Sequence, residues 1–247
     1  DRRCFAYFHP AMPHEPLIFV EVALVPEMAA NVHDILDANA PMGDVSAATT
    51  AIFYSISNAQ KGLVGISFGN FLIKRVVELL KHDVPNLKKF ATLSPIPGFG
   101  KWSAQILDED AFELTNAERK ALSPLVDGKS DGERLKSALG RPDWYKDEQL
   151  AAALKMQVSR MAAHYLHGER RPDGKAKDPV AHFHLSNGAR MERLNWLGDT
   201  SQKGLSQAHG MMINYLYRVS DIESNSGAYS SSGKIAVSSS VKPLLRD

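Results

Sequence analysis

A glycine-rich turn between a strand and an amphipathic helix places the strongest constraint on how this chain folds. The segment 62–98 reads GLVGISFGNFLIKRVVELLKHDVPNLKKFATLSPIPG. Its pattern predicts a short strand at Leu63–Ile66, a helix that begins at Asn70, and a second strand at Lys89–Leu93 that is ended by Pro95. Strand, turn, helix and strand in this order indicate an α/β or α+β domain.

The glycine turn supports two functional interpretations. Backbone amides exposed at a turn that opens a helix form an anion site, which favours a phosphate-bearing ligand. The same turn spells Gly65-Ile66-Ser67-Phe68-Gly69, the G-x-S-x-G of a hydrolase nucleophile elbow. However, only about 60 residues with one credible helix precede Ser67, which is too short for the crossovers that an α/β-hydrolase places before its elbow. We therefore favour Ser67 as a small turn residue, while the hydrolase remains an alternative.

The rest of the chain alternates between strand and helix signals. Prolines in the segment 10–16 predict a loop, and not a tight two-residue hairpin, between the first two strands. The segment Ser224–Ser232 is rich in serine and glycine and predicts a loop. The further predicted strands are Cys4–His9, Leu17–Leu24, Thr49–Ser57, Arg190–Leu197 and Met211–Val219, and the main predicted helices are Glu27–Leu36, Gln149–His167, Val180–Leu185 and a weak final one at Gly233–Leu245.

The overall composition excludes several classes of protein. The 247 residues include 29 basic and 28 acidic side chains, for a net charge of +1, whereas a protein that binds nucleic acid normally has a basic excess. No apolar run approaches the roughly 20 residues that cross a bilayer, so we expect no membrane partner. Cys4 is the only cysteine, which favours a reducing compartment. The chain opens on a strand without a methionine, and we interpret it as a fragment of a longer protein.

Two polar residues stand in unusual settings. Ser94 ends a strand and precedes Pro95 and Pro97, whose rings fix the backbone, so the serine could be held in one orientation. A serine that merely ends a strand explains the same spacing. Asp178 and Pro179, an N-cap followed by a proline at the first helical position, predict the start of a short helix that contains His184. His184 comes two residues after His182; on a helix this spacing points the two rings to different sides, so we predict no metal site.

Tyr215 and Tyr217 share one face of a late strand because side chains alternate along a strand. Most such pairs are core packing. A phenol near a reactive group could instead donate a proton or a hydrogen bond, and the sequence does not choose between these roles.

Several segments, taken together, resemble the malonyl-CoA decarboxylase family. They cover essentially the whole chain in order, whereas any one of them alone would be weak evidence. The segments are ATTAIFYSIS at 48–57, GLVGISFGNFLIKRVV at 62–77, LSPIPGFGKW at 93–102, FHLSNGA at 183–189 and NWLGDTSQKGLSQAHGMMINYLY at 195–217.

The resemblance implies a fold, an activity and partners. It implies a GNAT-like catalytic domain over residues 1–247, with a mixed central sheet flanked by helices and a helical insertion between the fifth strand, at 89–93, and the sixth, at 190–197. The family's N-terminal helical oligomerisation domain would be absent from this chain. The implied reaction converts malonyl-CoA to acetyl-CoA and CO2 without an organic cofactor, since CoA is part of the substrate. A homo-oligomer is implied, largely through the missing domain, in the cytoplasm of a bacterium or the mitochondrial matrix of a eukaryote.

The resemblance also assigns residues. Ser94 of the LSPIPGF motif and His184 of the FHLSNGA motif would be catalytic and would contact the substrate, with Asn187 or Tyr217 in support. A serine hydrolase that uses Ser67, a GNAT N-acetyltransferase that needs an amine acceptor, and a CoA-binding module without activity are the alternatives. The implied CoA-binding loop consists of Val64, Gly65, Ile66, Ser67, Phe68, Gly69 and Asn70.

Overall fold

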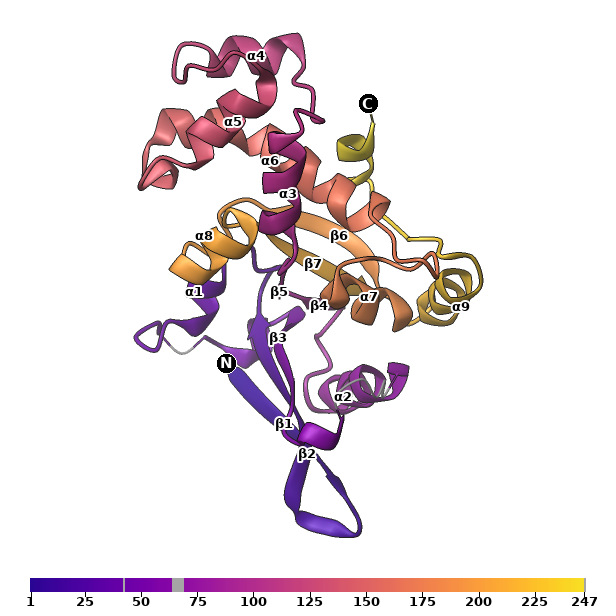
Figure 1. Cartoon of the computed structure of the whole chain (residues 1–247). Helices are drawn as coiled ribbons and strands as arrows, with labels where there is room; N and C mark the ends of the chain where they lie inside the picture. The colour runs from indigo at the N-terminus through magenta and orange to yellow at the C-terminus, as the bar shows by residue number, and fades with distance from the viewer. Residues whose placement is uncertain (42, 64–68, 247) are drawn as a thin grey trace.

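The computed structural model describes residues 1–41, 43–63 and 69–246, and its centre is a mixed sheet (Figure 1). In the described residues the sheet has seven strands in the order β1-β2-β3-β4-β7-β5, with β6 paired to β7. Among the named strands of the described residues, β3 and β4 form the one parallel pair. The strands are β1 Arg2–His9, β2 Met12–Val25, β3 Thr50–Asn58, β4 Lys89–Thr92, β5 Ser94–Pro95, β6 Arg190–Asn195 and β7 Met212–Tyr217.

The parallel pair exists because a helix connects its strands. The chain leaves β3, forms helix α2 (Gly69–Asp83) and returns as β4, which is the crossover that parallel strands require. The pairing ends at Phe53↔Thr92, while β3 continues to Asn58 and the chain after β4 pairs with β7 instead. The two parallel strands therefore separate at this point. The predicted helix and return strand are confirmed; of the strand predicted at 63–66, Leu63 closes a 3-10 turn and the rest lies outside the described residues.

The other helices are distributed unevenly over the chain. The segment between β5 and β6 is helical, and α3, α4, α5 and α6 gather beyond one end of the sheet (Figure 1). The predicted mixed α/β class with a central mixed sheet is confirmed. The prediction that these helices are an insertion, and the prediction that the fold is GNAT-like, remain implications of the family resemblance. The helices are α1 Val32–Leu36, α3 Phe99–Asp108, α4 Asn116–Leu122, α5 Asp131–Leu139, α6 Glu148–Gly168, α7 Pro179–Ser186, α8 Gln202–Ala208 and α9 Ile222–Ser232.

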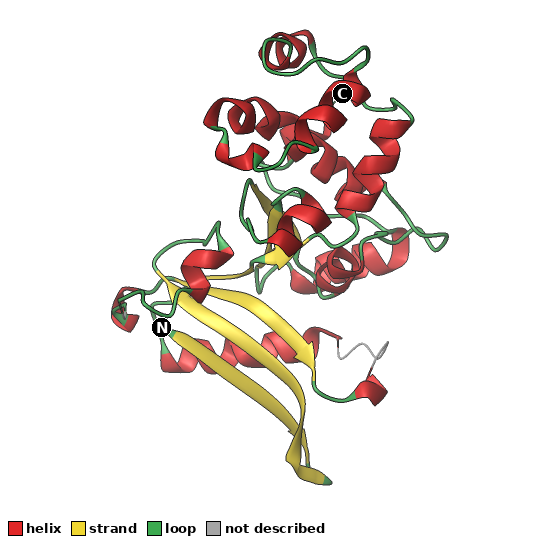
Figure 2. Ribbon diagram, turned by 60° about the vertical axis from the view of Figure 1, so that its left-hand side comes forward, coloured by secondary structure: helices red, strands yellow, loops and turns green. Residues whose placement is uncertain are grey.

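The connection between β1 and β2 corrects one prediction. The register pairs His9 with Met12, so the two strands are joined by a tight turn, and β2 begins well before the predicted residue 17. The prolines are tolerated because β3 ends opposite Ile18, which leaves the tip of β2 with a neighbour on one side only. The hairpin tip consequently projects beyond the rest of the sheet (Figure 2).

Helix α1 is shorter than predicted, since it begins only after Asn31. The carbonyl oxygens of Met28 and Ala29 accept hydrogen bonds from Arg193, at 2.7 and 3.1 Å, and Asn214 also donates to Ala29. Side chains from distant strands thus take carbonyls that a longer helix would have used itself.

The C-terminal segment reverses two predictions. Residues predicted as a loop form α9, because buried Ile222 and Tyr229 anchor it against the rest of the protein and its serines bond carbonyls of the preceding turn, as Ser232 does with Ala228. The predicted final helix is mostly extended and ends in a 3-10 turn at Lys242–Leu245. Its Ala236 carbonyl accepts from the Met191 amide of β6, so pairing with the sheet replaces helical bonds.

The two faces of the sheet pack against different parts of the protein. One face packs under α1, with Ala91, Leu93, Met212 and Leu216 in a small apolar cluster. The other faces the main core and presents Phe90, Ile213, Tyr215 and Tyr217. Because side chains alternate along a strand, Thr92 and Ser94 point to the face that carries the tyrosines. The predicted common face of Tyr215 and Tyr217 is confirmed.

Candidate active site

Two elements that are far apart in sequence bring Ser94 and His184 together. Ser94 begins β5 and is paired with Ile213 of β7. His184 lies in α7, whose start is fixed by Asp178: its Oδ1 accepts the amides of Val180 and Ala181 at 3.0 and 2.9 Å. An aspartate cap followed by proline is a strong helix start, and the sequence predicted it. Both side chains are buried, at 4% and 5% exposure.

A continuous chain of hydrogen bonds links Tyr217, His184, Ser94 and Thr92. The Tyr217 hydroxyl lies 2.8 Å from His184 Nδ1, and His184 Nε2 lies 3.2 Å from Ser94 Oγ. Ser94 Oγ in turn donates to Thr92 Oγ1 at 2.8 Å. Thr92 Oγ1 also accepts a hydrogen bond from the amide of Tyr215, which fixes the last residue of this hydrogen-bonded series to strand β7.

The direction of these bonds follows from counting protons. A hydroxyl has one proton, and that of Ser94 goes to Thr92. The bond between Ser94 and His184 then requires a proton on Nε2, and Nδ1 is left to accept from Tyr217. The resting serine does not donate to the histidine, as the nucleophile of a serine hydrolase must.

Burial sets the protonation states of His184 and Tyr217. Desolvation lowers the pKa of His184 from 6.5 to about 3, and it raises the pKa of Tyr217 well above 10. Both side chains are therefore neutral near pH 7. The ring of Tyr215 stacks on the imidazole with centroids 4.7 Å apart, which adds to the exclusion of water. The site thus holds neutral hydrogen-bond donors in a fixed geometry.

Ser94 and His184 line a cavity of about 620 Å³. It lies where β3 and β4 separate, so the far half of β3 forms one wall and the start of α7 another. Lys203 of α8 is the cation in the described lining. The other lining residues are Phe53, Tyr54, Ser55, Ile56, Asn58, Leu93, Pro95, Pro179, Val180 and Phe183. The volume is that of a small-molecule site.

The remaining predicted residues lie as follows. Asn187 caps the end of α7, where its Nδ2 donates to the Phe183 carbonyl at 2.8 Å, so it holds the helix and does not contact the histidine. Val64 to Phe68 lie outside the described residues. Gly69 and Asn70 form the first turn of α2.

Sequence reasoning did not single out Thr92 or Lys203. Thr92 stands two residues before Ser94 in the chain, and this spacing, which puts two side chains on one face, was a usable signal. Lys203 comes from α8, which no pattern linked to the serine. In the parts of the chain that the structure describes, no group of three or more histidine, cysteine, aspartate or glutamate side chains is arranged to hold a metal ion. No described helix combines the length and apolarity that a membrane span needs.

The malonyl-CoA decarboxylase C-terminal domain model matches residues 1–247. The chain belongs to this family. Among curated members, the mitochondrial malonyl-CoA decarboxylase of Anser anser anser is 44% identical over 97% of this chain and 49% of its own length. That of Rattus norvegicus is 40% identical over 99% of this chain and 51% of its own length. The chain thus spans about half the length of these family members.

Solved structures of the family share the fold. The malonyl-CoA decarboxylase of Rhodopseudomonas palustris has a TM-score of 0.87 and 48% identity, and covers 99% of this chain and 53% of its own. The enzyme from Agrobacterium vitis has a TM-score of 0.86 and 48% identity, over 100% and 57%. At this likeness the overall fold of this chain is shared with these family members.

Proposed function

We propose that this chain is the catalytic domain, over residues 1–247, of an enzyme that decarboxylates malonyl-CoA to acetyl-CoA. The observation that supports this most directly is the hydrogen-bonded chain Tyr217–His184–Ser94 at the wall of a substrate-sized cavity, in a member of the malonyl-CoA decarboxylase family.

The reaction needs a site that accepts electrons and delivers a proton. When the bond between the carboxylate and the methylene carbon breaks, its electron pair moves into the thioester and forms an enolate, while CO2 departs. In the reaction the Ser94 hydroxyl turns from Thr92 to the enolate oxygen and stabilises it, while the His184 N–H, which donates to Ser94 at rest, supports the serine. The same pair supplies the proton to carbon, and one proton from solvent restores it.

The neutral state of His184 suits this chemistry. A protonated imidazolium would hold the substrate carboxylate by charge and so stabilise the ground state. Burial keeps the imidazole neutral, and Leu93, Val180 and Phe183 provide apolar walls. A carboxylate is poorly solvated among such groups, whereas CO2 and a delocalised enolate lose less, which favours the transition state.

The CoA part of the substrate is assigned to the glycine turn. Helix α2 begins at Gly69, directly after Val64–Phe68, and amides at a helix start attract phosphate. Lys203 adds a positive charge at the active-site cavity. We assign no organic cofactor, since the donors described above suffice, and we place the homo-oligomer contacts in the half of the family length that this chain does not span.

Product analysis tests the proposal. The protein is incubated with malonyl-CoA, and acetyl-CoA and CO2 are quantified for the parent, Ser94→Ala, His184→Ala and Ser67→Ala. We expect the first two substitutions to lower kcat by about 10²- to 10⁴-fold and Ser67→Ala to retain turnover.

Parallel assays separate the alternatives. Hydrolysis of an activated ester that is lost in Ser67→Ala, without decarboxylation, would establish a serine hydrolase. Acyl transfer from acetyl-CoA to amines would establish an acetyltransferase. CoA binding without any turnover would leave a binding module. Each of these results contradicts the proposal.

A further inference from the structure

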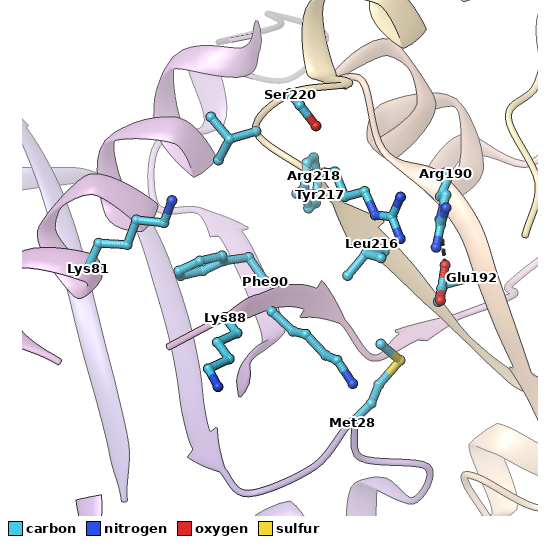
Figure 3. A pocket seen from close by; sticks show the side chains of 12 residues that line it. Met28, Lys81, Lys88, Phe90, Arg190, Glu192, Leu216, Tyr217, Arg218 and Ser220 are labelled. Atoms are coloured by element: carbon cyan, nitrogen blue, oxygen red, sulfur yellow. Dashed lines mark hydrogen bonds and ion pairs between the residues drawn. The ribbon is translucent and has the colours of Figure 1, made fainter. Parts of the chain in front are cut away.

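A second cavity, of about 490 Å³, lies at the other end of β4 and is surrounded by cations. We call it the basic pocket. Figure 3 shows basic side chains arranged around Phe90 and Leu216, with Glu192 as the acidic group of the lining. The basic residues are Lys81 from α2, Lys88 and Lys89 from the start of β4, Arg190 from β6 and Arg218 after β7.

Most of this positive charge is not neutralised within the described residues. Glu192 is already paired with Arg190, at 2.6 Å. Arg218 approaches Asp221 only at 4.0 Å. Lys81 lies over the Phe90 ring at 5.6 Å, and no ion pair involves Lys81 or the lysines at the start of β4 in the described part of the chain. The pocket therefore attracts anions.

The strand register concentrates the charge at one edge of the sheet. Phe90 is paired with Tyr217 at the end of the antiparallel β4–β7 ladder, and Lys89 and Arg218 are the next residues of the two segments beyond this last pair. Like charges in such positions are destabilising. The chain as a whole has 29 basic and 28 acidic residues. The excess of basic side chains around this pocket is therefore a local feature and does not follow from the overall composition. An anion bound between them would relieve the repulsion.

We propose that the basic pocket binds a small molecule that carries two or more anionic groups, phosphate or carboxylate. Its volume lies within the usual range of ligand sites, roughly 300–1,000 Å³. Arginine and lysine together match such groups, since arginine binds planar oxyanions with two hydrogen bonds and lysine supplies a compact charge. Phe90 and Leu216, which belong to opposite faces of the sheet, add apolar lining that suits the carbon skeleton of the ligand.

The basic pocket and the active-site cavity are different cavities. They share no described lining residue: Lys88 and Lys89 precede or begin β4, whereas Ser94 and Pro95 follow its end. Tyr217 connects them, because it lines the basic pocket and its hydroxyl bonds His184 of the candidate active site. The start of α2 is also distant from Lys81, because Lys81 is 12 residues beyond Gly69, which corresponds to about 18 Å along a helix.

Calorimetric titration with two probes tests the proposal. Inorganic pyrophosphate represents phosphate ligands and citrate represents carboxylate ligands. Each is titrated into the protein alone and into protein saturated with acetyl-CoA, at low and at moderate salt. We expect at least one probe to bind with a Kd below about 1 mM, with the same Kd in the presence of acetyl-CoA and a higher Kd as salt increases.

Substitutions locate the binding. Lys88→Gln combined with Lys89→Gln should raise the Kd at least tenfold, and Arg218→Gln alone should raise it severalfold. These side chains are exposed, so the variants keep the fold, which circular dichroism checks. Lys155→Gln, an exposed lysine of α6 outside the pocket, is the matched control and should leave the Kd unchanged.

Three results would overturn the proposal. Equal weakening by Lys155→Gln would show a general attraction to a charged surface. Displacement of the probe by acetyl-CoA would place the anion at the CoA site. If neither pyrophosphate nor citrate gives a binding heat, the pocket binds neither phosphate nor carboxylate ligands.

Discussion

The hydroxyl of Tyr217 lies 2.8 Å from Nδ1 of His184, on the side of the imidazole opposite Ser94. This bond orients the ring and leaves the proton on Nε2, the nitrogen that faces Ser94. Tyr215, two residues earlier on the same face, stacks on the same imidazole, yet its buried hydroxyl has no hydrogen-bond partner among the described residues. The two tyrosines therefore differ in what their hydroxyls do.

This difference gives a matched pair of substitutions. Tyr217→Phe removes the donor to Nδ1, and loss of one such bond, worth about 1–2 kcal/mol, should lower kcat roughly 5- to 30-fold with little change in KM. Tyr215→Phe keeps the stacked ring and removes an unpaired polar group, so its kcat should fall much less and its unfolding free energy should not decrease. Steady-state kinetics and urea unfolding measure both. Equal losses of kcat would argue against an orienting hydrogen bond.

The protonation state of His184 is open to direct measurement. Because burial lowers its pKa to about 3, its imidazole should show no titration between pH 8 and pH 5. Proton NMR of the histidine ring signals, with His184→Ala to assign the signal, follows this directly. A His184 signal that titrates near its ordinary pKa of about 6.5 would contradict the neutral-donor mechanism.

Acid should destabilise this protein partly through its buried histidines. His184 and His209 have pKa values lowered to about 3 and about 4 by burial. Because these lie below the unfolded value of about 6.5, the unfolded state binds more protons, so stability falls as pH decreases below about 6.5. Each histidine contributes up to about 1.4 kcal/mol per pH unit, until the pH reaches its folded pKa.

His209 allows a test away from Ser94. It ends α8 in the left-handed conformation, with φ 51, which asparagine tolerates. His209→Asn should therefore reduce the dependence of the unfolding free energy on pH between about 6 and 4.5, by about 1 kcal/mol per unit. Urea titrations at several pH values measure the slope. An unchanged slope would show that His209 is not held neutral.

Two glycines with similar positive φ angles should respond differently to substitution. Gly188, which follows α7, has φ +80, and an added Cβ would collide with the Ile222 carbonyl oxygen. Gly174 has φ +76 with open space around it. Gly174→Ala should cost about 1 kcal/mol from the backbone alone, while Gly188→Ala should cost clearly more, because α7 and α9 must separate. Thermal unfolding compares the two, and similar losses would refute the steric argument.

The sequence predicted those parts of the site that depend on local signals. Asp178 and Pro179 predicted the start of α7, and alternation predicted the common face of Tyr215 and Tyr217. Ser94 and His184 were proposed through family motifs, since nothing in their own spacing linked a strand end to a helix 90 residues away. The pairing of Ser94 with Ile213 is a long-range contact, and local patterns carry no information about it.

Tertiary contacts account for the errors in the same way. Helix α1 was predicted too long because Arg193, far along the chain, takes the Met28 and Ala29 carbonyls. The hairpin was mistaken for a loop because its prolines lie where β2 has only one neighbour. In both places the structure depends on which distant residues lie alongside the segment, and the local sequence does not reveal them.

The pairing of β4 with β7 has a consequence for the order in which activity is acquired. Ser94 and His184 both precede Tyr217 in the sequence. The Tyr217 hydroxyl reaches His184 only once Phe90 and Tyr217 are paired across the sheet. Such distant pairings tend to form late in folding. During refolding, turnover should therefore reappear after most of the helical structure has returned, so enzymatic activity reports the closure of the sheet.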